Sequence, residues 1–447
     1  MVDENIIAIA EKVNKLAKKL GAEHSEVVLI QGKQNSINLE ESSIVKANSK
    51  SQTGIGLRVL VNKAIGLGTS TKFDDSLLEA MVKDAVSLAK VSSPNPDNIG
   101  FAEKPSDYPA VEGLYNKELA NLSSDKLVDS AIQALNASLE QDSTINVGGN
   151  IGLTVASKVI VNSNGVLAES DGSVMTVYIN NKITKDNDVG VGFDYGFART
   201  LKEIDSAKIG QTAAEKALGN LGGQKIDSGD YKLLIDKRAT RQTIGGILSQ
   251  GVSAYNIIQG TAFFNDRLAE EIASPNLTIV DNPLEAAGAG SRTFDDEGTP
   301  AQKVTIVENG TLLSYLSDVY TSNKLDIPNT GSATKQGYGG IPKPALTQIQ
   351  IEPGTASKDE LFAELGTGIY MESPIFAMAG TNISQQVDVG FWVEKGEIKF
   401  PVKNTMMGTT VYDILKNVQM VGKDLLFEGG MKSPMILLGE TKFSSGR

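Results

Sequence analysis

The sequence predicts an α+β fold in which two N-terminal α-β(n)-α units with antiparallel sheets precede a mixed, mostly β C-terminal domain. A helical pattern, several apolar or alternating runs and a second helical pattern occur twice before residue 226. The runs are short, and tight polar turns such as Ser163-Asn164-Gly165 are typical of hairpins rather than parallel crossovers. From Tyr231 the pattern changes to a strand, a helix and a long strand-rich stretch. We therefore expect three domains, at 1–110, 111–226 and 227–447.

The first unit begins and ends with an amphipathic helix. Apolar residues repeat at helical spacing over 4–20 and again over about 75–91. The second of these helices is predicted to place four apolar residues on one face: Leu78, Met81, Ala85 and Leu88. Between the helices lie the strand candidates SEVVLIQG, NSINLEESS, GIGLRVLVN and KAIGLGTS. Three prolines between 94 and 105 indicate a closing loop.

The second unit repeats this order. A helix is predicted from near Ser123, and a closing helix over about 205–220. The strand candidates between them are NIGLTVAS, KVIVNSNGVLAES, SVMTVYINNK and DVGVGFDYGFART. The segment NLGGQKIDSGD, residues 220–230, is the expected major boundary.

The C-terminal domain should begin with the strand YKLLID and a helix over about 239–255. That helix has one apolar face: Ile244, Ile247, Leu248, Val252 and Tyr255. The pairs Asn309-Gly310 and Lys395-Gly396 indicate hairpin turns. The second pair joins the two halves of FWVEKGEIKFPV, in which Trp392, the one tryptophan, is expected to anchor an interior or an interface.

The composition excludes several classes of function. A net charge of −12 without a concentrated Lys/Arg stripe disfavours direct nucleic-acid binding. No apolar run approaches the roughly 20 residues that span a bilayer, and Asp3 and Glu4 stand where a secretory signal needs positive charge. A cytoplasmic protein without a membrane role is expected. Zero cysteines and one histidine leave few ligands for a transition metal and no thiolate nucleophile.

The segment FDDEGTPAQKVTIVENG, residues 294–310, is the main candidate for chemistry. With Asp281, the run of Asp295, Asp296 and Glu297 could supply hard oxygen ligands or an acid/base pair. Adjacent strand residues point to opposite faces, so at most two of the three can converge. The Gly298 that follows suits a turn, in which Asp side chains accept hydrogen bonds from free backbone amides. We favour this structural role.

Other motifs are weaker candidates. His24 follows the first helix without a nucleophile-elbow motif anywhere in the chain, and it is interpreted as a surface residue. The segments GIG, 54–56, and KQGYGG, 335–340, complete neither a dinucleotide motif nor a phosphate loop. They are interpreted as strand glycines and a mobile loop.

Taken together, several segments resemble the TldD/PmbA family, also called modulator of DNA gyrase. They are VNSNG (161–165), the stretch 277–318 around the acidic run, NTGSA (329–333), IEPG (351–354), GFWVEKGEIKFPV (390–402), and VQMVGKDL and SPMILLG near the end. The C-terminal half matches densely and in order. The resemblance marks family-motif positions that are expected to be structural or to lie at an interface: Asn162, Ser163, Gly165, Asp281, Phe294, Asp295, Glu297, Gly298, Thr330, Gly331 and Trp392.

The resemblance implies two kinds of subunit. In the TldD kind, His-Glu-x-x-x-His on a helix and a downstream cysteine bind zinc for peptide hydrolysis. The matching segment of this chain, residues 239–264, contains no His, Cys, Asp or Glu. The chain is therefore most like the PmbA or TldE kind, for which the resemblance implies no catalytic residue and no metal of its own. One departure is that NISQQVDV replaces the Gly-Asp-Phe-Ser usual before the GFW hairpin.

Three functional hypotheses follow. The first is a metal-free subunit that pairs with a zinc-bearing TldD-type partner in a peptidase acting on unfolded or small peptides. The second is a self-associating scaffold, for example a homodimer that holds peptides by strand addition. The third is an independent hydrolase that uses Asp281, Asp295 or Glu297.

Overall fold

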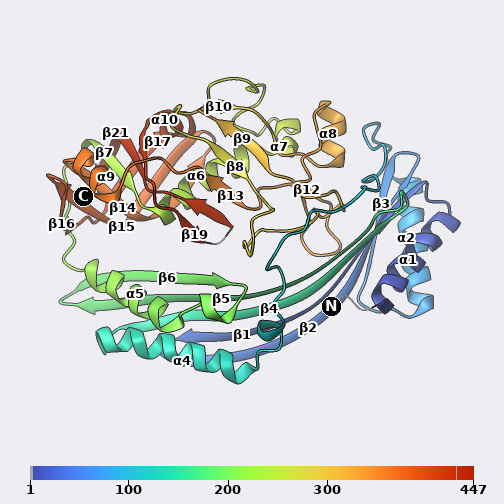
Figure 1. The fold of residues 1–447 in the computed structure, drawn as a ribbon, viewed down its shortest axis with the longest axis horizontal. Coiled ribbons are helices and arrows are strands. Elements are labelled where there is room, and N and C mark those ends of the chain that lie inside the picture. Colours follow the sequence, from blue (N-terminus) through green and yellow to red (C-terminus); the bar gives the residue numbers. More distant parts are fainter. Residues whose placement is uncertain (1–3, 429, 447) are drawn as a thin grey trace.

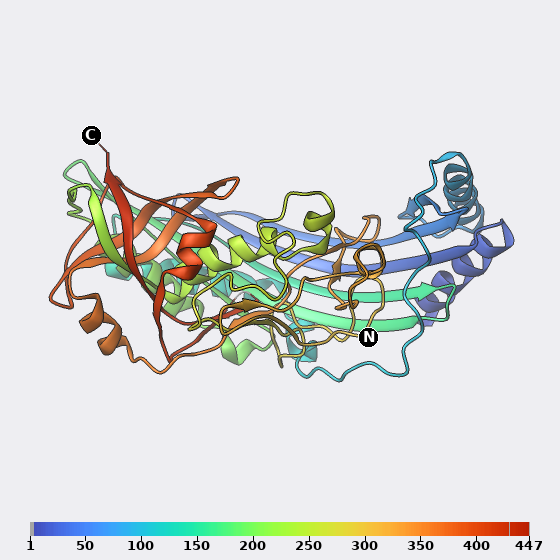
Figure 2. The same ribbon diagram turned by 90° about the horizontal axis from the view of Figure 1, so that it is seen from above.

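The computed structural model describes residues 4–428 and 430–446 and confirms the α+β class (Figure 1). A long antiparallel sheet runs beneath a C-terminal domain, and Figure 2 shows its strands following the long axis of the molecule. Its strands are β1 (His24–Glu40), β2 (Ser43–Val61), β3 (Ala64–Ser70), β4 (Asn146–Asn162), β5 (Leu167–Lys185) and β6 (Asp188–Ala198). Their order, β3-β2-β1-β4-β5-β6, joins the strands of both N-terminal units in one sheet.

The N-terminal helices cover the face of this sheet that points away from the C-terminal domain (Figure 1). They are α1 (Glu4–Lys19), α2 (Asp75–Val91), α3 (Lys117–Ala120), α4 (Ser124–Gln141), the 3-10 helix η1 (Leu201–Glu203) and α5 (Ser206–Gly219). Val27 and Leu29 of β1 pack with α1 and α2, whereas Ile37 and Leu39 pack with α4 and α5. Because alternate residues of a strand share a face, one strand supplies both cores.

The N-terminal strands are longer than the sequence indicates. Residues 31–36 of β1 include glycine and polar residues, which predict a turn, yet β1 pairs continuously with β2 and with β4 through this region. Hydrogen bonds to two neighbouring strands satisfy the backbone there and compensate for the weak local preference.

Helix positions agree more closely with expectation than strand lengths do. The helix predicted over 75–91 is α2, and the Ser123 side chain caps α4 by accepting a hydrogen bond from the Lys126 amide. Within α2, Leu78, Met81 and Ala85 are buried as predicted. Leu88 is not, because it lies at the edge of the face and its side chain is 47% exposed.

The C-terminal domain contains a closed five-stranded barrel and a mixed sheet. The barrel contains β7 (Gly229–Ile235), β14 (Gly368–Ala379), β15 (Asn382–Glu394), β17 (Thr405–Thr410) and β21 (Ile436–Ser445). These strands follow the order β14-β7-β21-β17-β15 and close through the β14–β15 pairing. The second sheet contains β8 (Ile279–Asp281), β9 (Val304–Glu308), β10 (Thr311–Leu312), β13 (Ile349–Ile351), β19 (Leu426–Glu428) and β20 (Met431–Ser433). Its order is β10-β9-β8-β13-β20-β19, and it includes one parallel pair, β13 with β20. Both predicted hairpin turns are confirmed, since Asn309, Gly310, Lys395 and Gly396 all have positive φ between paired strands.

The elements of this domain have the following bounds. Its helices are α6 (Lys237–Gly251), α7 (Ala254–Ile258), α8 (Val319–Leu325), α9 (Lys358–Leu365) and α10 (Val411–Lys416). Its other strands are β11 (Ala333–Thr334), β12 (Lys343–Pro344), β16 (Glu397–Pro401) and β18 (Val418–Val421).

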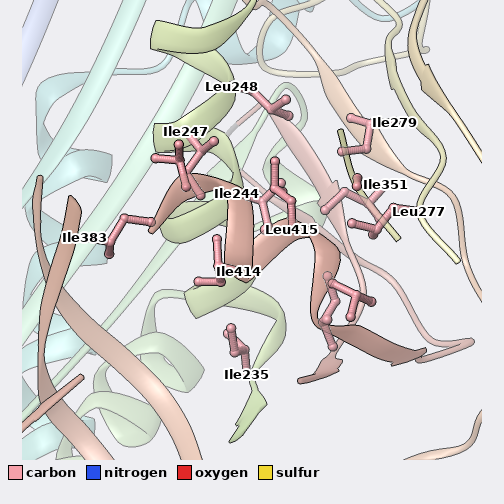
Figure 3. Close-up of a cluster of buried hydrophobic side chains, with 14 of the residues drawn as sticks. Ile235, Ile244, Ile247, Leu248, Leu277, Ile279, Ile351, Ile383, Ile414 and Leu415 are labelled. Atoms are coloured by element: carbon pink, nitrogen blue, oxygen red, sulfur yellow. The ribbon is translucent and has the colours of Figure 1, made fainter. Parts of the chain in front are cut away.

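The helix expected over 239–255 is divided in two. It ends at Gly251, and α7 starts after Ser253, whose hydroxyl donates to the Pro344 carbonyl while the Ala254 amide donates to Leu316. These hydrogen bonds to distant residues replace the helical hydrogen bonds where the helix is interrupted. Figure 3 shows Ile244, Ile247 and Leu248 of α6 in the main core, facing side chains of α10 and of the mixed sheet.

Candidate functional site

The acidic run forms a tight, buried corner between the N-terminal sheet and the C-terminal domain. The Asp295 amide donates to the Thr299 carbonyl and the Gly298 amide to the Asp295 carbonyl, which closes the turn. Gly298 has φ +81°, and a Cβ there would lie 2.6 Å from Cγ1 of Val166. The left-handed conformation and the close approach of the N-terminal sheet both require glycine at this position.

Asp295 stabilises the corner from inside. Its Oδ1 accepts hydrogen bonds from the amides of Glu297 and Thr299, each at 2.9 Å, and its Oδ2 accepts one from the Ala333 amide at 3.1 Å. Burial, together with the nearby negative charge of Glu297, raises the pKa of Asp295 to about 7.

Asp296 and Glu297 make separate connections. Asp296 pairs with Lys158 of β4 and accepts a hydrogen bond from the Lys335 amide at 2.7 Å. Although burial opposes it, the charge of Lys158 holds the pKa of Asp296 below its ordinary value. Glu297 instead accepts from Nη2 of Arg58 at 2.9 Å and from the Val319 amide at 2.9 Å.

Arg58 extends this arrangement into a buried ionic network. Its Nε and Nη2 donate to the two carboxylate oxygens of Glu26, at 3.0 and 2.7 Å, and Lys335 also pairs with Glu26. The side chains are 8% exposed for Arg58, 3% for Glu297 and 0% for Glu26. Burial alone would raise the pKa of Glu26, but Arg58 and Lys335 hold that pKa below its ordinary value. The network therefore ties β1 and β2 to two segments of the C-terminal domain.

Most of the family-motif positions surround this corner. The Asn162 carboxamide donates to the Ala102 carbonyl and accepts from the Val166 amide, while Ser163 bonds with the backbone of Ser25. Gly165, with φ +91°, completes that turn. These contacts hold the start of β1, and hence Glu26, in place.

Phe294, Thr330 and Gly331 support the corner from the C-terminal side. The Phe294 ring is buried 5.4 Å from that of Tyr108, whose hydroxyl donates to the Gly298 carbonyl. Thr330 exchanges hydrogen bonds with Ser317. Gly331 lies two residues before Ala333, whose amide donates to Asp295. The Gly331 carbonyl accepts a hydrogen bond from Arg292.

Two motif positions make their contacts elsewhere. Asp281 lies at the end of β8 and accepts hydrogen bonds from Thr347 and from the Gln348 amide, and burial raises its pKa. Trp392 packs against the C-terminal core with its ring 5.0 Å from that of Tyr231, and its Nε1 donates to Glu394.

Of the two glycine-rich segments, 54–56 lies in strand β2 as expected, whereas 335–340 differs from expectation. Residues 335–340, predicted to be a mobile loop, are anchored: Lys335 is buried in the ionic network, and Tyr338 lies over Gly54 and Gly56 of β2. His24, at the start of β1, is partly buried and borders a groove of about 580 Å³ beside the acidic corner.

A second, smaller cavity of about 130 Å³ lies where the two parts of the molecule meet. Arg58, Glu297 and Asp318 contribute to its wall, together with aromatic residues of three segments. Asp318 caps α8 by accepting hydrogen bonds from the amide and the hydroxyl of Thr321. Burial and the charge of Glu297 raise the pKa of Asp318 to about 6.

Sequence reasoning did not select the N-terminal members of the network. Glu26 interrupts the apolar strand SEVVLIQG, and Arg58 interrupts GIGLRVLVN. A charged residue inside a buried apolar run needs a partner, so this interruption is the signal by which both could have been found.

These pKa shifts predict an unusual pH dependence of stability. Because Asp295 and Asp318 have folded-state pKa values of about 7 and 6, the folded state keeps protons that the unfolded chain releases above about pH 4. Stability should therefore fall as pH rises from about 4 to 7. Glu26 and Asp296, with lowered pKa values, act oppositely and destabilise the fold as pH falls below about 4.

Thermal melts at constant ionic strength should accordingly show the highest melting temperature near pH 4 and a decline from there to about pH 7. Asp318→Asn should flatten the decline, chiefly between about pH 4 and 6. A melting temperature that climbs steadily from pH 5 to 8 in the wild type would contradict this prediction.

The residues of α6 do not fit a zinc site. Zinc is bound by Cys, His, Asp or Glu side chains, and residues 239–264 contain none of them. Across residues 4–428 and 430–446, no group of three or more His, Cys, Asp or Glu side chains is placed to hold a metal ion. Within the same part of the chain, no helix is long and apolar enough to cross a membrane.

Comparison with known protein families gives three consecutive matches. The descriptions are PmbA/TldA metallopeptidase domain 1 for residues 25–89, central domain for 117–221 and C-terminal domain for 228–445. The metalloprotease PmbA homolog of Haemophilus influenzae is 27% identical over 444 residues, which covers 96% of this chain and 94% of the relative. Metalloprotease PmbA of Escherichia coli O157:H7 is 24% identical over 422 residues, with 92% and 89% covered.

Solved structures share the fold. A putative modulator of DNA gyrase from Thermotoga maritima superposes with a TM-score of 0.89 at 23% identity, covering 98% of this chain and 100% of the other. TldE from Thermococcus kodakarensis gives a TM-score of 0.88 at 21% identity, with the same coverage. With its three domains matched in order along most of its length, the chain belongs to the PmbA/TldD metallopeptidase family.

Proposed function

We propose that this chain is the metal-free subunit of a peptidase, and that a homologous TldD-type partner supplies the zinc that hydrolyses unfolded or small peptides. The observation that carries the proposal is the chemistry of residues 239–264, which offer hydroxyl, amide, cationic and apolar side chains but no zinc ligand. A metallopeptidase needs the metal to activate water. In this proposal the activated water belongs to the partner.

The packing of α6 supports a structural role for the helix. Its inward side chains Ile244, Ile247 and Leu248 fill the main core (Figure 3). At its N-terminal end, Arg238 pairs with Asp194 of β6, so the helix also fixes the C-terminal domain on the N-terminal sheet. A helix with these contacts is suited to shaping a subunit that assembles with another.

One observation favours the scaffold alternative. Residues 43–52 of β2 are exposed, and β3 pairs with β2 only from Ile55 onward. Over this length the outer edge of β2 has no partner strand within the described parts of the chain. A free edge of this kind can add a strand from a peptide or from a second copy.

The test assays this chain, a homologue with His-Glu-x-x-x-His, and their mixture on casein and on short unstructured peptides, with and without a chelator. This chain alone should hold far less than one zinc after dialysis and should hydrolyse nothing, whereas the mixture should be active and chelator-sensitive. Replacing the motif glutamate of the homologue should abolish the activity of the mixture.

The same samples separate the hypotheses. A stable mixed complex supports the subunit proposal, and an exclusive self-dimer supports the scaffold. Chelator-resistant hydrolysis by this chain alone, or full activity of the homologue without this chain, would refute the subunit proposal.

A further inference from the structure

The ionic network beside the cavity contains more buried carboxylates than buried bases. Glu26, Asp295, Glu297 and Asp318 are four buried acids, whereas the buried bases Arg58 and Lys335 pair only with Glu26 and Glu297. Both oxygens of Asp295 accept hydrogen bonds from backbone amides. The neighbouring Asp296 is paired with Lys158. An uncompensated charge in a buried site is costly unless a ligand or a proton compensates for it.

The uncompensated oxygen belongs to Asp318. Both oxygens of Glu297 accept hydrogen bonds, one from Arg58 and the other from the Val319 amide. In Asp318, both hydrogen bonds go to Oδ1, and Oδ2 has no hydrogen-bond donor within the described residues. The residue is 2% exposed and borders the cavity, so any group that reaches Oδ2 must come from the cavity.

Aromatic rings form much of the remaining wall. Phe101, Tyr255 and Tyr320 line the cavity, and Phe101 already lies 4.8 Å below the guanidinium of Arg58. Lys343 holds its ammonium 4.0 Å from the centroid of the Tyr255 ring, although this lysine is exposed and water screens its charge. Carboxylate and aromatic faces together are the surroundings in which proteins bind organic ammonium ions.

We propose that this cavity binds a primary ammonium group, with Asp318 as its counter-charge and the aromatic rings around its carbon atoms. A volume of about 130 Å³ admits a group of only a few heavy atoms. The ammonium can come from a small free amine or from the N-terminus of a peptide. The proposal does not depend on the proposed function, since it concerns binding alone.

The electrostatics of Asp318 agree with this assignment. Its pKa is raised by burial and by Glu297, and the charge of Arg58 offsets this rise only in part. A bound ammonium would bring the pKa of Asp318 down again. Ligand addition near pH 6 should therefore release protons, which isothermal titration calorimetry in buffers of different ionisation enthalpy detects.

The main experiment is calorimetric titration of the full chain at pH 7.5 with ethylammonium chloride. Saturable binding of one ion per chain is expected, whereas potassium chloride at the same ionic strength and ethanol, a neutral analogue, should give no saturable binding. Titration with Ala-Ala-Ala amide and with its N-acetylated form distinguishes the two sources. Binding of the free peptide but not of the acetylated one assigns the site to peptide N-termini, and binding of ethylammonium alone assigns it to free amines.

Asp318→Asn is the decisive variant. Asparagine keeps an oxygen that can cap α8, so the fold should persist, but the ammonium loses its charged acceptor and affinity should fall by about tenfold or more. Asp205→Asn is the matched control, because Asp205 also caps a helix but is exposed on α5. The Asp205→Asn variant should bind ethylammonium as the wild type does.

A second variant tests the site independently, in case Asp318→Asn does not fold. Ile341 lines the cavity while its side chain is 51% exposed, so Ile341→Trp should fold and should obstruct the entrance. Loss of binding in this variant supports the site. Absence of saturable ethylammonium binding in the wild type, equal binding of ethanol or potassium, or wild-type affinity in both variants would overturn the proposal.

Discussion

Replacing Arg58 by methionine should lower the free energy of unfolding by about 3–5 kcal/mol. Arg58 makes two hydrogen bonds to Glu26 and one to Glu297, all buried. Without the guanidinium, Glu26 keeps only Lys335 as a charged partner, and Glu297 keeps only the Val319 amide. Most of the cost comes from leaving buried carboxylates without compensation. Urea unfolding followed by circular dichroism measures it.

Two further variants show whether this cost arises from the charges. Adding Glu26→Gln and Glu297→Gln to the methionine variant should recover part of the stability, because the uncompensated charges are removed. Arg267→Met is the matched control: Arg267 pairs with Glu270 three residues away at the surface, and its loss should cost less than about 1 kcal/mol. A loss below 1 kcal/mol for Arg58→Met would show that the network does not stabilise the fold.

The second large effect is expected from Gly56→Ala. A Cβ at Gly56 would lie 1.8 Å from the carbonyl oxygen of Tyr338, so the 335–340 segment must move away from β2. Such overpacking typically costs about 1–3 kcal/mol. Because Lys335 lies in the same segment, its pairing with Glu26 should weaken as well. Limited proteolysis should then show faster cleavage within 335–340, and urea unfolding should show the lower stability.

Gly408→Ala separates this contact from the general effect of replacing a strand glycine. Gly408 lies in β17, and a Cβ there would meet no atom within 4 Å. Its replacement should change stability by no more than about 0.5 kcal/mol and leave cleavage at 335–340 unchanged. If both alanine variants behave alike, the close approach of Tyr338 does not hold the segment.

Local patterns in the sequence predicted the helices and turns well. The apolar repeat of α2 and the Ser123 cap of α4 depend on residues within a few positions of one another, as do the turns at Asn309-Gly310 and Lys395-Gly396. Strand lengths were predicted less well. The polar middle of β1 resembles a turn in isolation and is extended only because β2 and β4 pair with it on both sides.

The role of individual charged residues was the hardest to predict. Asp295 was predicted to satisfy backbone amides in a turn, and it accepts hydrogen bonds from two of them, while a third comes from the distant Ala333 amide. That expectation required only the neighbouring Gly298. The pairing of Arg58 with Glu297 joins residues 239 positions apart, and no periodicity or spacing within either segment specifies it.

By itself, the sequence determined the α+β class, most of the helix positions, the hairpin turns and the absence of zinc-ligand residue types from 239–264. These properties follow from side-chain chemistry and from interactions between near neighbours, which a linear pattern records. The tertiary structure decided that the acidic corner meets Glu26, Arg58, Lys158 and Lys335 across the two parts of the molecule, and that a cavity remains beside Asp318. These contacts depend on burial, because a charge removed from water must be compensated by the residues that the fold brings to it.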